Sequence, residues 1–394
     1  MKIQKLILLF FFVFCFKLSL CQIWPKTYLP GDGTSPLSVT GSYDKGYFIG
    51  GWFISSDGFP INGLLIKTDL NGEMLWYKTF GDYNDGTGVN DVKQTNDYGL
   101  IVSGVTKKTD SWGDSFIMKL NKCGESEWCR IYSVGQNRAD VALSIEQVPD
   151  GYIAYIFYGY DLSSNNKVHL LRLGQNGDII WQQVYGQKDS LMQGADGYYM
   201  MVTPDNHYLI NGFCYYPDSG TVEPKYLRPL IIKVDSTGNA EWELPWSTIN
   251  EKSFYGMSNR SIVDNHHTIY SCGRHIEEEA TPPGDRPTML ITDSVGNEIS
   301  YHDLVPNSWQ AVFFNINWFQ DSTIALDGGW IITPGGEGQV GVFKVDKDGN
   351  VLDSANIMQT VYCFADAIVD QDNKLFLVQG QYFENQWHTY SWKL

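Results

Sequence analysis

The sequence predicts an all-β protein, a seven-bladed β-propeller of four-stranded blades, and three observations support this prediction. The chain of 394 residues is 43% hydrophobic and 14% aromatic and holds 39 glycines, a composition that suits many short strands joined by tight turns. A segment of about 50 residues, the size of a propeller blade, recurs along the chain. The two ends of the chain carry complementary parts of one such segment.

The recurring segment is clearest in its first copy. A turn at Asp44–Gly46 precedes the β-rich run Tyr47–Gly51, a second run Leu64–Thr68 follows, and the turn Asp69–Gly72 leads to a strand near Trp76. Six copies share the turn glycine, at Gly72, Gly124, Gly177, Gly238, Gly296 and Gly349. The spacings of these glycines are 52, 53, 61, 58 and 53 residues. A seventh copy, which begins at Asp372–Asn373, brings the predicted number of blades to seven.

Each copy contains four short strands, and its turns explain why they pair as hairpins. Asp or Asn at the first turn position accepts hydrogen bonds from its own turn, as we expect for Asp69 and Asn121. Glycine at the last position supplies the positive φ that closes the turn. The pattern is weaker in three places, with Gly174 at the Asp position, Tyr301 displaced from the tryptophan register, and Asp353 at the tryptophan position.

The two ends of the chain predict how the ring closes. The seventh copy stops at Leu394, where its third strand ends. The missing fourth strand is predicted at the other end, because Trp24–Tyr28 matches Trp76–Phe80 and Trp24 precedes Trp76 by 52 residues. The N-terminal strand should therefore complete the last blade, which also removes an exposed sheet edge.

The first residues have the composition of a secretory signal peptide. Met1–Lys5 is basic, Leu6–Phe16 is apolar, and Ser19–Cys21 resembles a cleavage site. We therefore expect a signal peptide at residues 1–21, one propeller domain at residues 22–394, and export to the periplasm, the cell surface or the medium. In the alternative, Cys21 is the lipid-modified first residue of a lipoprotein. No later stretch is apolar enough for a transmembrane segment.

The net charge argues against nucleic acid as a partner, and the cysteine content argues against a disulfide framework. The chain has 28 basic and 45 acidic residues, a formal net charge of −17, so it should repel nucleic acid. An odd number of cysteines follows the predicted leader, which favours isolated thiols over a disulfide framework. These cysteines are Cys123, Cys129, Cys214, Cys272 and Cys363.

The first copy resembles a known family of repeats. The segment Ile66–Trp76 resembles the tryptophan-docking repeat of the pyrroloquinoline-quinone-like propellers, and it is still more similar to propeller repeats of exported Bacteroidetes-type bacterial proteins. The resemblance covers nearly all of the chain after the leader and implies the blade, not a reaction. The quinone enzymes usually have eight blades and adjacent cysteines, which this chain lacks. We therefore predict no cofactor.

Several conspicuous residues are better explained by the fold than by chemistry. The periodic tryptophans should pack between blades, although they could form a sugar-binding stripe, and the periodic lysines with Arg172 should pair with turn carboxylates. The acidic turn Asp346–Asn350 lacks the closing Glu of a calcium loop, and His266–His267 follow an ordinary turn. We therefore predict no metal site. The periodic cations are Lys67, Lys119, Lys233, Lys344 and Lys393.

The connections that differ between copies are the candidates for function. Connections from the second to the third strand and from one blade to the next should emerge on one face, where exposed aromatics could contact a glycan or a protein. The predicted ligand-binding residues are Trp112, Tyr158, Tyr160, Tyr215, Tyr216 and Trp387. The sequence thus predicts a non-catalytic, exported binding or scaffold propeller with a protein or glycan ligand. The oligomeric state is left open.

The alternative is a glycan-active propeller enzyme, a hydrolase or a lyase, with acids near the central channel. The candidate acids in or near the innermost strands are Asp91, Asp140, Asp196 and Asp366. They are expected at different offsets within the repeat, so no constellation is assigned. No motif in the sequence identifies a catalytic residue.

Overall fold

A computed structural model describes fifteen stretches of the chain. These are residues 24–28, 33–54, 60–81, 86–106, 113–133, 140–158, 167–186, 194–217, 224–245, 255–277, 284–305, 307–332, 336–359, 365–383 and 386–394. At some strand ends within these stretches only the backbone is described. The predicted leader and Cys21 lie outside the described residues. Within them, no helix has the length and apolar character needed to span a bilayer.

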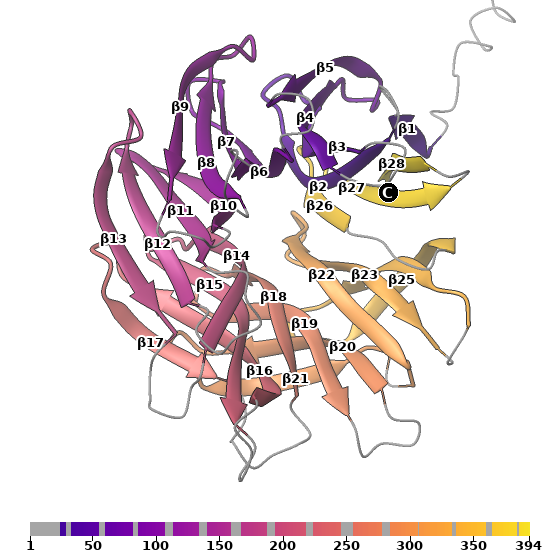
Figure 1. Cartoon of the computed structure of the whole chain (residues 1–394). Coiled ribbons are helices and arrows are strands. Elements are labelled where there is room, and N and C mark those ends of the chain that lie inside the picture. Colours follow the sequence, from indigo (N-terminus) through magenta and orange to yellow (C-terminus); the bar gives the residue numbers. More distant parts are fainter. Residues whose placement is uncertain are drawn as a thin grey trace, which may run out of the picture.

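The described chain forms seven four-stranded antiparallel sheets arranged as blades around a ring (Figure 1), which confirms the predicted seven-bladed β-propeller. Each blade runs outward from an innermost strand. The innermost strands of blades 1 to 7 are β2 (Thr34–Gly41), β6 (Gly88–Gln94), β10 (Asp140–Val148), β14 (Gly194–Val202), β18 (Tyr255–Val263), β22 (Gln310–Trp318) and β26 (Ala365–Val369).

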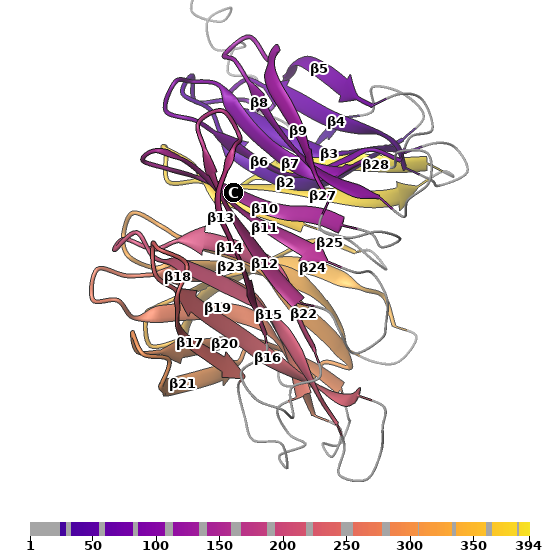
Figure 2. The same cartoon turned by 60° about the vertical axis from the view of Figure 1, so that its left-hand side comes forward.

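The other strands follow from the centre to the rim, as Figure 2 shows from a second direction. The second strands are β3 (Tyr47–Ile54), β7 (Leu100–Thr106), β11 (Gly151–Tyr158), β15 (Tyr208–Pro217), β19 (Ile269–Glu277), β23 (Ile324–Ile331) and β27 (Leu375–Phe383). The third strands are β4 (Pro60–Thr68), β8 (Asp114–Leu120), β12 (Lys167–Gly174), β16 (Pro224–Val234), β20 (Gly284–Thr292), β24 (Gln339–Val345) and β28 (Gln386–Lys393). The outer strands are β5 (Met74–Phe80), β9 (Ser126–Tyr132), β13 (Ile179–Tyr185), β17 (Ala240–Pro245), β21 (Glu298–Asp303), β25 (Val351–Gln359) and β1 (Lys26–Tyr28).

The ring closes as the sequence predicts. Strand β1 pairs antiparallel with β28, with Lys26 opposite Ser391 and Tyr28 opposite Thr389. Blade 7 is therefore built from both ends of the described chain, and the two ends lie side by side in Figure 1. Pulling β1 away would open the last sheet at its outer edge.

The two faces of the ring differ in their connections. On the hairpin face, tight turns join the first strand to the second and the third to the fourth. The predicted turn glycines have positive φ, for example 75° at Gly72 and 79° at Gly177, and each donates its N–H to the carbonyl three residues earlier. The opposite face, the loop face, holds the strand ends from which the remaining connections start. Many residues of those connections lie outside the described stretches.

Hydrophobic side chains are buried between neighbouring blades. Seven described clusters of buried residues each join two adjacent blades, including the pair formed by blades 7 and 1. In the cluster between blades 3 and 4, Ile153 and Tyr155 of one blade pack with Met200 and Ile210 of the next. A single blade has two apolar faces, and only its two neighbours keep both of them from water.

The periodic tryptophans pack between blades, as predicted. Each one lies over the turn glycine of the next blade, so that a Cβ added to Gly177 would come 2.9 Å from the Trp128 ring and one added to Gly72 would come 2.4 Å from Trp24. The Trp128 indole also donates its Nε1–H to the carbonyl of Gln175 at 3.1 Å. Glycine is therefore required at this turn for its φ and for the space under the indole.

A tyrosine extends this contact in several blades. Four residues after the tryptophan, the Tyr132 hydroxyl donates to the carbonyl of Gly177 at 2.6 Å, and Tyr28 and Tyr185 bond the next turn glycine in the same way. Burial raises the pKa of Tyr132 to about 12, so these hydroxyls stay protonated and act as donors at neutral pH.

The periodic cations pair with turn carboxylates, which confirms their predicted structural role. Lys67 lies 2.7 Å from Asp44, and Lys119 lies 2.8 Å from Asp97. The remaining pairs are Arg172 with Asp150, Lys233 with Asp205, Lys344 with Asp321, and Lys393 with Asp370. Because Lys67 and Lys119 are almost completely buried, each ammonium needs its carboxylate partner to offset the hydration that it loses.

The described cysteines are not linked to one another. Cys123 and Cys129 are exposed thiols, and Cys214 and Cys272 are buried thiols. These four residues therefore form no disulfide framework, as expected. Cys363 lies outside the described stretches.

We predict that Trp128→Ala lowers the free energy of unfolding by about 3 kcal/mol, because it removes a large side chain from the blade 2–blade 3 contact. Ser300 occupies the tryptophan register in blade 5, so Ser300→Ala serves as a matched control with an expected cost of about 0.5 kcal/mol. Denaturant unfolding measures both variants. Equal losses would contradict the docking role of the indole.

Candidate functional site

Seven polar residues, one from each blade, occupy the same register position around the centre of the ring. Six of the innermost strands contain a β-bulge, and the position is the first residue after the bulge. In β26 it is the residue at the same distance from the turn. The seven residues are Ser38, Asp91, Ser144, Tyr199, Arg260, Asn315 and Asp366.

Several of these side chains bond the backbone of the next blade. Asp366 accepts the N–H of Val39 at 2.7 Å, and Asp91 accepts the N–H of Ile145 at 3.0 Å. Ser38 accepts the equivalent N–H from blade 2 at 3.2 Å. Since a bulge disturbs the ladder beside it, these side chains supply acceptors for amides near the bulge and join the innermost strands into a belt.

The expectation that the candidate acids occupy different offsets was wrong for two of them. Asp91 and Asp366 hold the same register position, since each precedes the first residue of its turn, Thr95 or Asp370, by four residues. Asp140 lies at the start of β10 and is fully buried. For Asp196, in β14, only the backbone is described.

A chain of charged and aromatic side chains crosses the centre of the ring. From blade 2, Lys93 donates to the Tyr199 hydroxyl of blade 4 at 3.2 Å. The Arg260 guanidinium of blade 5 lies 3.9 Å from the centre of the Tyr199 ring and donates to Asp366 of blade 7 at 2.6 Å. Glu146 of blade 3 forms an ion pair with Lys93 at 3.0 Å. The contacts therefore connect blades that are not neighbours.

The surroundings of this chain fix its protonation at neutral pH. Burial raises the pKa of the Tyr199 hydroxyl, so Tyr199 does not act as a base there. Burial lowers the pKa of Lys93, but Asp91 and Glu146 outweigh it and hold that pKa well above its ordinary value. Lys93 and Arg260 are each about a fifth exposed, with exposed side-chain fractions of 20% and 17%. Carboxylates already pair with both cations. These contacts therefore act as a brace that holds the blades together across the centre of the ring.

Asp327 is a buried acid beside this brace. Its side chain is fully buried in β23, one carboxyl oxygen accepts from Asn315 Nδ2 at 2.7 Å, and the other has no hydrogen-bond partner. Burial raises its pKa to about 7, and the charge of Asp366 adds to the increase while Arg260 opposes it. Asp327 is therefore an acid that the fold keeps protonated well above its ordinary range.

The structure leaves most of the predicted ligand-binding aromatics untested. Trp112 and Tyr160 lie outside the described residues, and for Tyr158, Tyr215 and Tyr216 only the backbone in β11 and β15 is described. Trp387 is half-buried at the loop-face end of β28. These six residues remain a prediction for the loop face.

A cluster of ionisable side chains lies at the loop-face end of blade 5, which sequence reasoning missed. Arg274 pairs with Asp285 at 2.7 Å. His275 Nδ1 lies 3.1 Å from Asp303, whose other oxygen accepts from Thr288 at 2.6 Å. Beneath them Arg286 donates to the carbonyl of Ser308. We call Arg274, His275, Asp285, Arg286 and Asp303 the blade 5 cluster.

This cluster departs from the repeat. The positions of Arg274 and His275 in β19 correspond by register to Trp52 and Phe53 in β3. In blade 5, therefore, charged groups take places that hold aromatic side chains in blade 1. His275 and Arg286 are almost completely buried, while Arg274 keeps 27% of its side chain exposed. Burial raises the pKa of Asp285, although Arg274 pulls it down.

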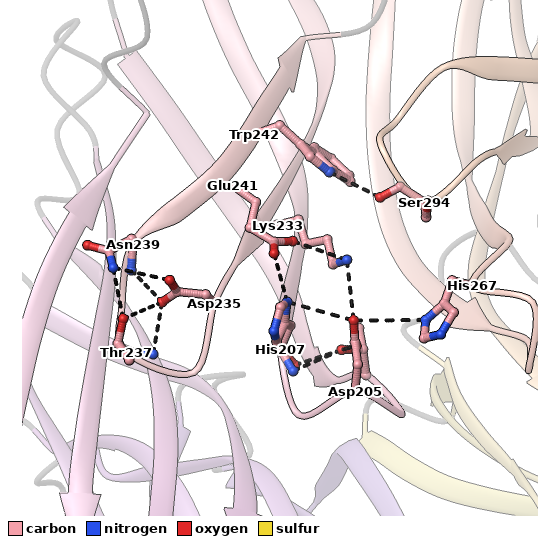
Figure 3. A network of polar contacts seen from close by, with 11 residues as sticks. Asp205, His207, Lys233, Asp235, Thr237, Asn239, Glu241, Trp242, His267 and Ser294 are labelled. Atoms are coloured by element: carbon pink, nitrogen blue, oxygen red, sulfur yellow. Dashed lines mark hydrogen bonds and ion pairs between the residues drawn. The ribbon is translucent and has the colours of Figure 1, made fainter.

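Another polar network lies on the hairpin face, between blades 4 and 5 (Figure 3). His207 stands where blades 1 and 2 have Gly46 and Gly99. A Cβ at Gly99 would lie 2.5 Å from the Lys119 ammonium. In blade 4 the Lys233 ammonium lies 3.5 Å from Asp205 and 3.1 Å from Glu241, which His207 Nδ1 also approaches at 3.1 Å (Figure 3).

This network is a variant of the structural cation–carboxylate pair. His267 of blade 5 adds a longer contact, 3.8 Å from Nδ1 to Asp205, while its neighbour His266 donates its N–H to Asp264 within the turn. Across the described stretches, no three His, Cys, Asp or Glu side chains are grouped for a metal ion. The turn at Asp346 accepts the N–H groups of Asp348 and Asn350, as an ordinary hairpin turn does.

A groove of about 470 Å³ opens between blades 3 and 4 on the hairpin face. Trp181 and Tyr208 line it together with Arg172. Arg172 is already bonded to Asp150 and to the carbonyls of Tyr152 and Leu173. These bonds lie within blade 3, and the Trp181 ring lies over Gly238 of blade 4. The cation of the groove is therefore already paired, and the blade 5 cluster remains the described candidate site on the loop face.

Solved structures with the same fold include polysaccharide lyases. A PL25 ulvan lyase bound to -[GlcA(1-4)Rha3S]- has a TM-score of 0.60 with 7% identity, and the match covers 90% of this chain and 93% of that one. The polysaccharide lyase Uly1 has a TM-score of 0.57 with 10% identity, covering 93% and 91%. A protein of unknown function from Bacteroides caccae has a TM-score of 0.44 with 11% identity, covering 75% and 90%.

At these identities the similarity establishes the propeller fold alone. No protein-family model and no curated protein sequence matches the chain. The predicted membership of an exported Bacteroidetes-type family therefore stays a prediction.

We predict that Asp327→Asn stabilises the protein above about pH 7 and has little effect near pH 4. The folded pKa of about 7 lies above the ordinary value of 3.8, so the wild-type protein loses stability as pH rises from about 4 to 7. The asparagine cannot ionise, and its gain above pH 7 should reach about 4 kcal/mol. Denaturant unfolding at both pH values measures it. A gain of equal size at both would contradict the buried acid as its cause.

Proposed function

We propose that this protein is an exported, non-catalytic binding propeller whose loop face takes a protein or glycan ligand, with the blade 5 cluster as part of the contact. The cluster is the observation that carries the proposal. It is a non-repeated group of ionisable side chains at the loop-face end of one blade, whereas the repeated polar residues bond neighbouring blades. A repeated position serves the ring in every copy, so a departure from the repeat is where a ligand contact can arise without loss of a blade contact.

The exposure of the cluster supports recognition by hydrogen bonds. Arg274 and Asp285 retain exposed fractions of 27% and 16%, and Asp303 retains 20%. Behind them, buried His275, Thr288 and Arg286 hold these groups in fixed directions. An exposed guanidinium and two carboxylates on a rigid support suit the hydroxyl groups of a sugar or the polar side chains of a protein.

The centre of the ring supports binding over catalysis. Asp91 accepts three hydrogen bonds, from Ser38, Ser144 and the N–H of Ile145. Asp366 accepts from Arg260 and from two backbone N–H groups. A general acid or base must be able to exchange its proton with a substrate. Both carboxylates instead accept hydrogen bonds that join the innermost strands, so neither is available for that exchange.

The second candidate is a glycan-active enzyme, and His275 is the observation that favours it. A histidine held through Nδ1 by a carboxylate is a common arrangement for proton transfer, and Arg274 beside it could neutralise an acidic sugar. The shared fold with polysaccharide lyases, one of them bound to a glucuronate-containing ligand, makes acidic glycans the first substrates to test. Export rests on the predicted signal peptide at residues 1–21.

The test is a glycan array and a polysaccharide pull-down with the purified protein, followed by a sugar-release assay on each hit. We expect binding without release, and we expect Arg274→Gln to weaken it at least about tenfold, because it removes the exposed guanidinium. A matched control is Arg130→Gln, since Arg130 also forms a surface ion pair, with Asp178 of the next blade.

Each outcome separates the candidates. Release of sugar that Asp303→Asn slows would support the enzyme and overturn the non-catalytic proposal. Binding that survives Arg274→Gln would remove the blade 5 cluster from the contact. If the glycans give no signal, a protein ligand captured through the loop face must depend on Arg274 in the same way, and its independence of Arg274 would contradict the proposal.

A further inference from the structure

The outer strand of blade 3, β13, is unlike the other outer strands. Its sequence, Ile179–Tyr185, contains no Asp, Glu, Lys or Arg. Each of the other six outer strands contains at least one charged residue: Lys26 in β1, Lys78 in β5, Glu127 and Arg130 in β9, Glu241 and Glu243 in β17, Glu298 and Asp303 in β21, and Asp353 in β25. Charges on an edge strand normally prevent it from pairing with another chain.

The side chains of β13 are apolar and exposed. Ile179, Ile180 and Val184 have exposed fractions of 50%, 56% and 45%. Strand β13 pairs with β12 on one side and is the edge of its sheet on the other. Alternate residues of an edge strand direct their N–H and C=O groups away from the sheet. The edge therefore offers backbone hydrogen bonds beside exposed apolar side chains.

We propose that β13 pairs with β13 of a second copy of this chain, as two antiparallel strands related by a two-fold axis at Gln182. The proposal is independent of the proposed ligand-binding function. Identical edges can pair in this way because a two-fold interface places the same patch on both copies.

The regular part of β13, Trp181–Tyr185, fits this pairing. With Gln182 on the axis, the two copies of Gln182 lie opposite each other. Residues 182 and 184 point to the same side of the strand, so on that side Val184 of each copy flanks the two amides. Ile180 lies where the register of β12 and β13 shifts, and it lines the groove between blades 3 and 4 together with Trp181.

Charge favours this edge over the rest of the surface. Two copies, each with a formal charge of −17, repel each other, and an uncharged strand reduces that repulsion at the point of contact. Asp178, which directly precedes β13, forms an ion pair with Arg130 at 3.0 Å. In β17, by contrast, the equivalent two-fold pair would place Glu243 against its own copy on the axis.

The size of the contact sets the expected affinity. A seven-residue strand pair is smaller than the interfaces of about 1,200–2,000 Å² that hold stable complexes. The dimer should therefore exchange with monomer, with a dissociation constant in the micromolar range.

Sedimentation velocity tests the proposal. The protein is measured without its predicted leader and over a range of concentrations. A reducing agent is included because Cys123 and Cys129 are exposed thiols. We expect wild-type protein to dimerise, and we expect Gln182→Lys and Gln182→Glu each to be monomeric, because each places like charges against each other on the axis. An equimolar mixture of the two variants should dimerise again, because Lys then faces Glu.

The mixture makes the test specific to this geometry. A variant that had merely unfolded would not recover in the mixture, and circular dichroism of each variant alone confirms its fold. Tyr77→Lys is the matched control, since Tyr77 occupies the register of Gln182 in β5 and is 45% exposed, and it should leave dimerisation unchanged. A monomeric wild type, or dimers that persist in both single variants, would overturn the proposal.

Discussion

The packing of each outer strand on the turn of the next blade is the contact on which the ring depends. Every blade has two apolar faces and little interior of its own, so its stability comes from its neighbours. Trp128 over Gly177 shows the contact in full: the indole covers the glycine, its Nε1–H reaches the carbonyl of Gln175, and Tyr132 bonds the glycine carbonyl. The contact recurs around the ring and is completed by Trp24 on Gly72, across the junction of the two chain ends.

Polar contacts at the centre complement the apolar contacts at the rim. Bulges in the innermost strands disturb the hydrogen-bond ladder, and side chains such as Asp91 and Asp366 bond amides of the following blade. The Lys93–Tyr199–Arg260 chain then links blades across the ring. Buried charge of this kind is tolerated because each group has a partner. Asp327 is an exception. One of its carboxyl oxygens has no hydrogen-bond partner, and its pKa is raised.

The sequence was sufficient for features that follow from one repeat at a time. The spacing of Gly72 and Gly124 predicts the turns, the match of Trp24 to Trp76 predicts the closure, and the periodic Lys67 predicts the ion pair with Asp44. All of these contacts lie within one blade or between adjacent blades. Periodicity alone therefore identifies them.

The sequence was insufficient where contacts join distant blades. The Arg260–Asp366 pair spans 106 residues, and no spacing rule relates blade 5 to blade 7. The shared position of Asp91 and Asp366 had a usable signal, because each lies four residues before the first residue of its turn, Thr95 or Asp370. The blade 5 cluster had a usable signal: alignment of the copies places Arg274 and His275 against Trp52 and Phe53. The predicted aromatics of the loop face had no such signal. The connections differ in length and sequence from blade to blade, so one copy cannot be aligned with another there.

The same comparison between copies explains why β13 and blade 5 are the informative places in this protein. In a ring of copies, a residue that is present in most blades serves the contact that every blade makes. A residue that is absent from one blade, such as the missing charge of β13, or present in one alone, such as His275 of blade 5, is released from that common requirement. We therefore infer that these two places are where contact with a ligand or with a second copy should be tested.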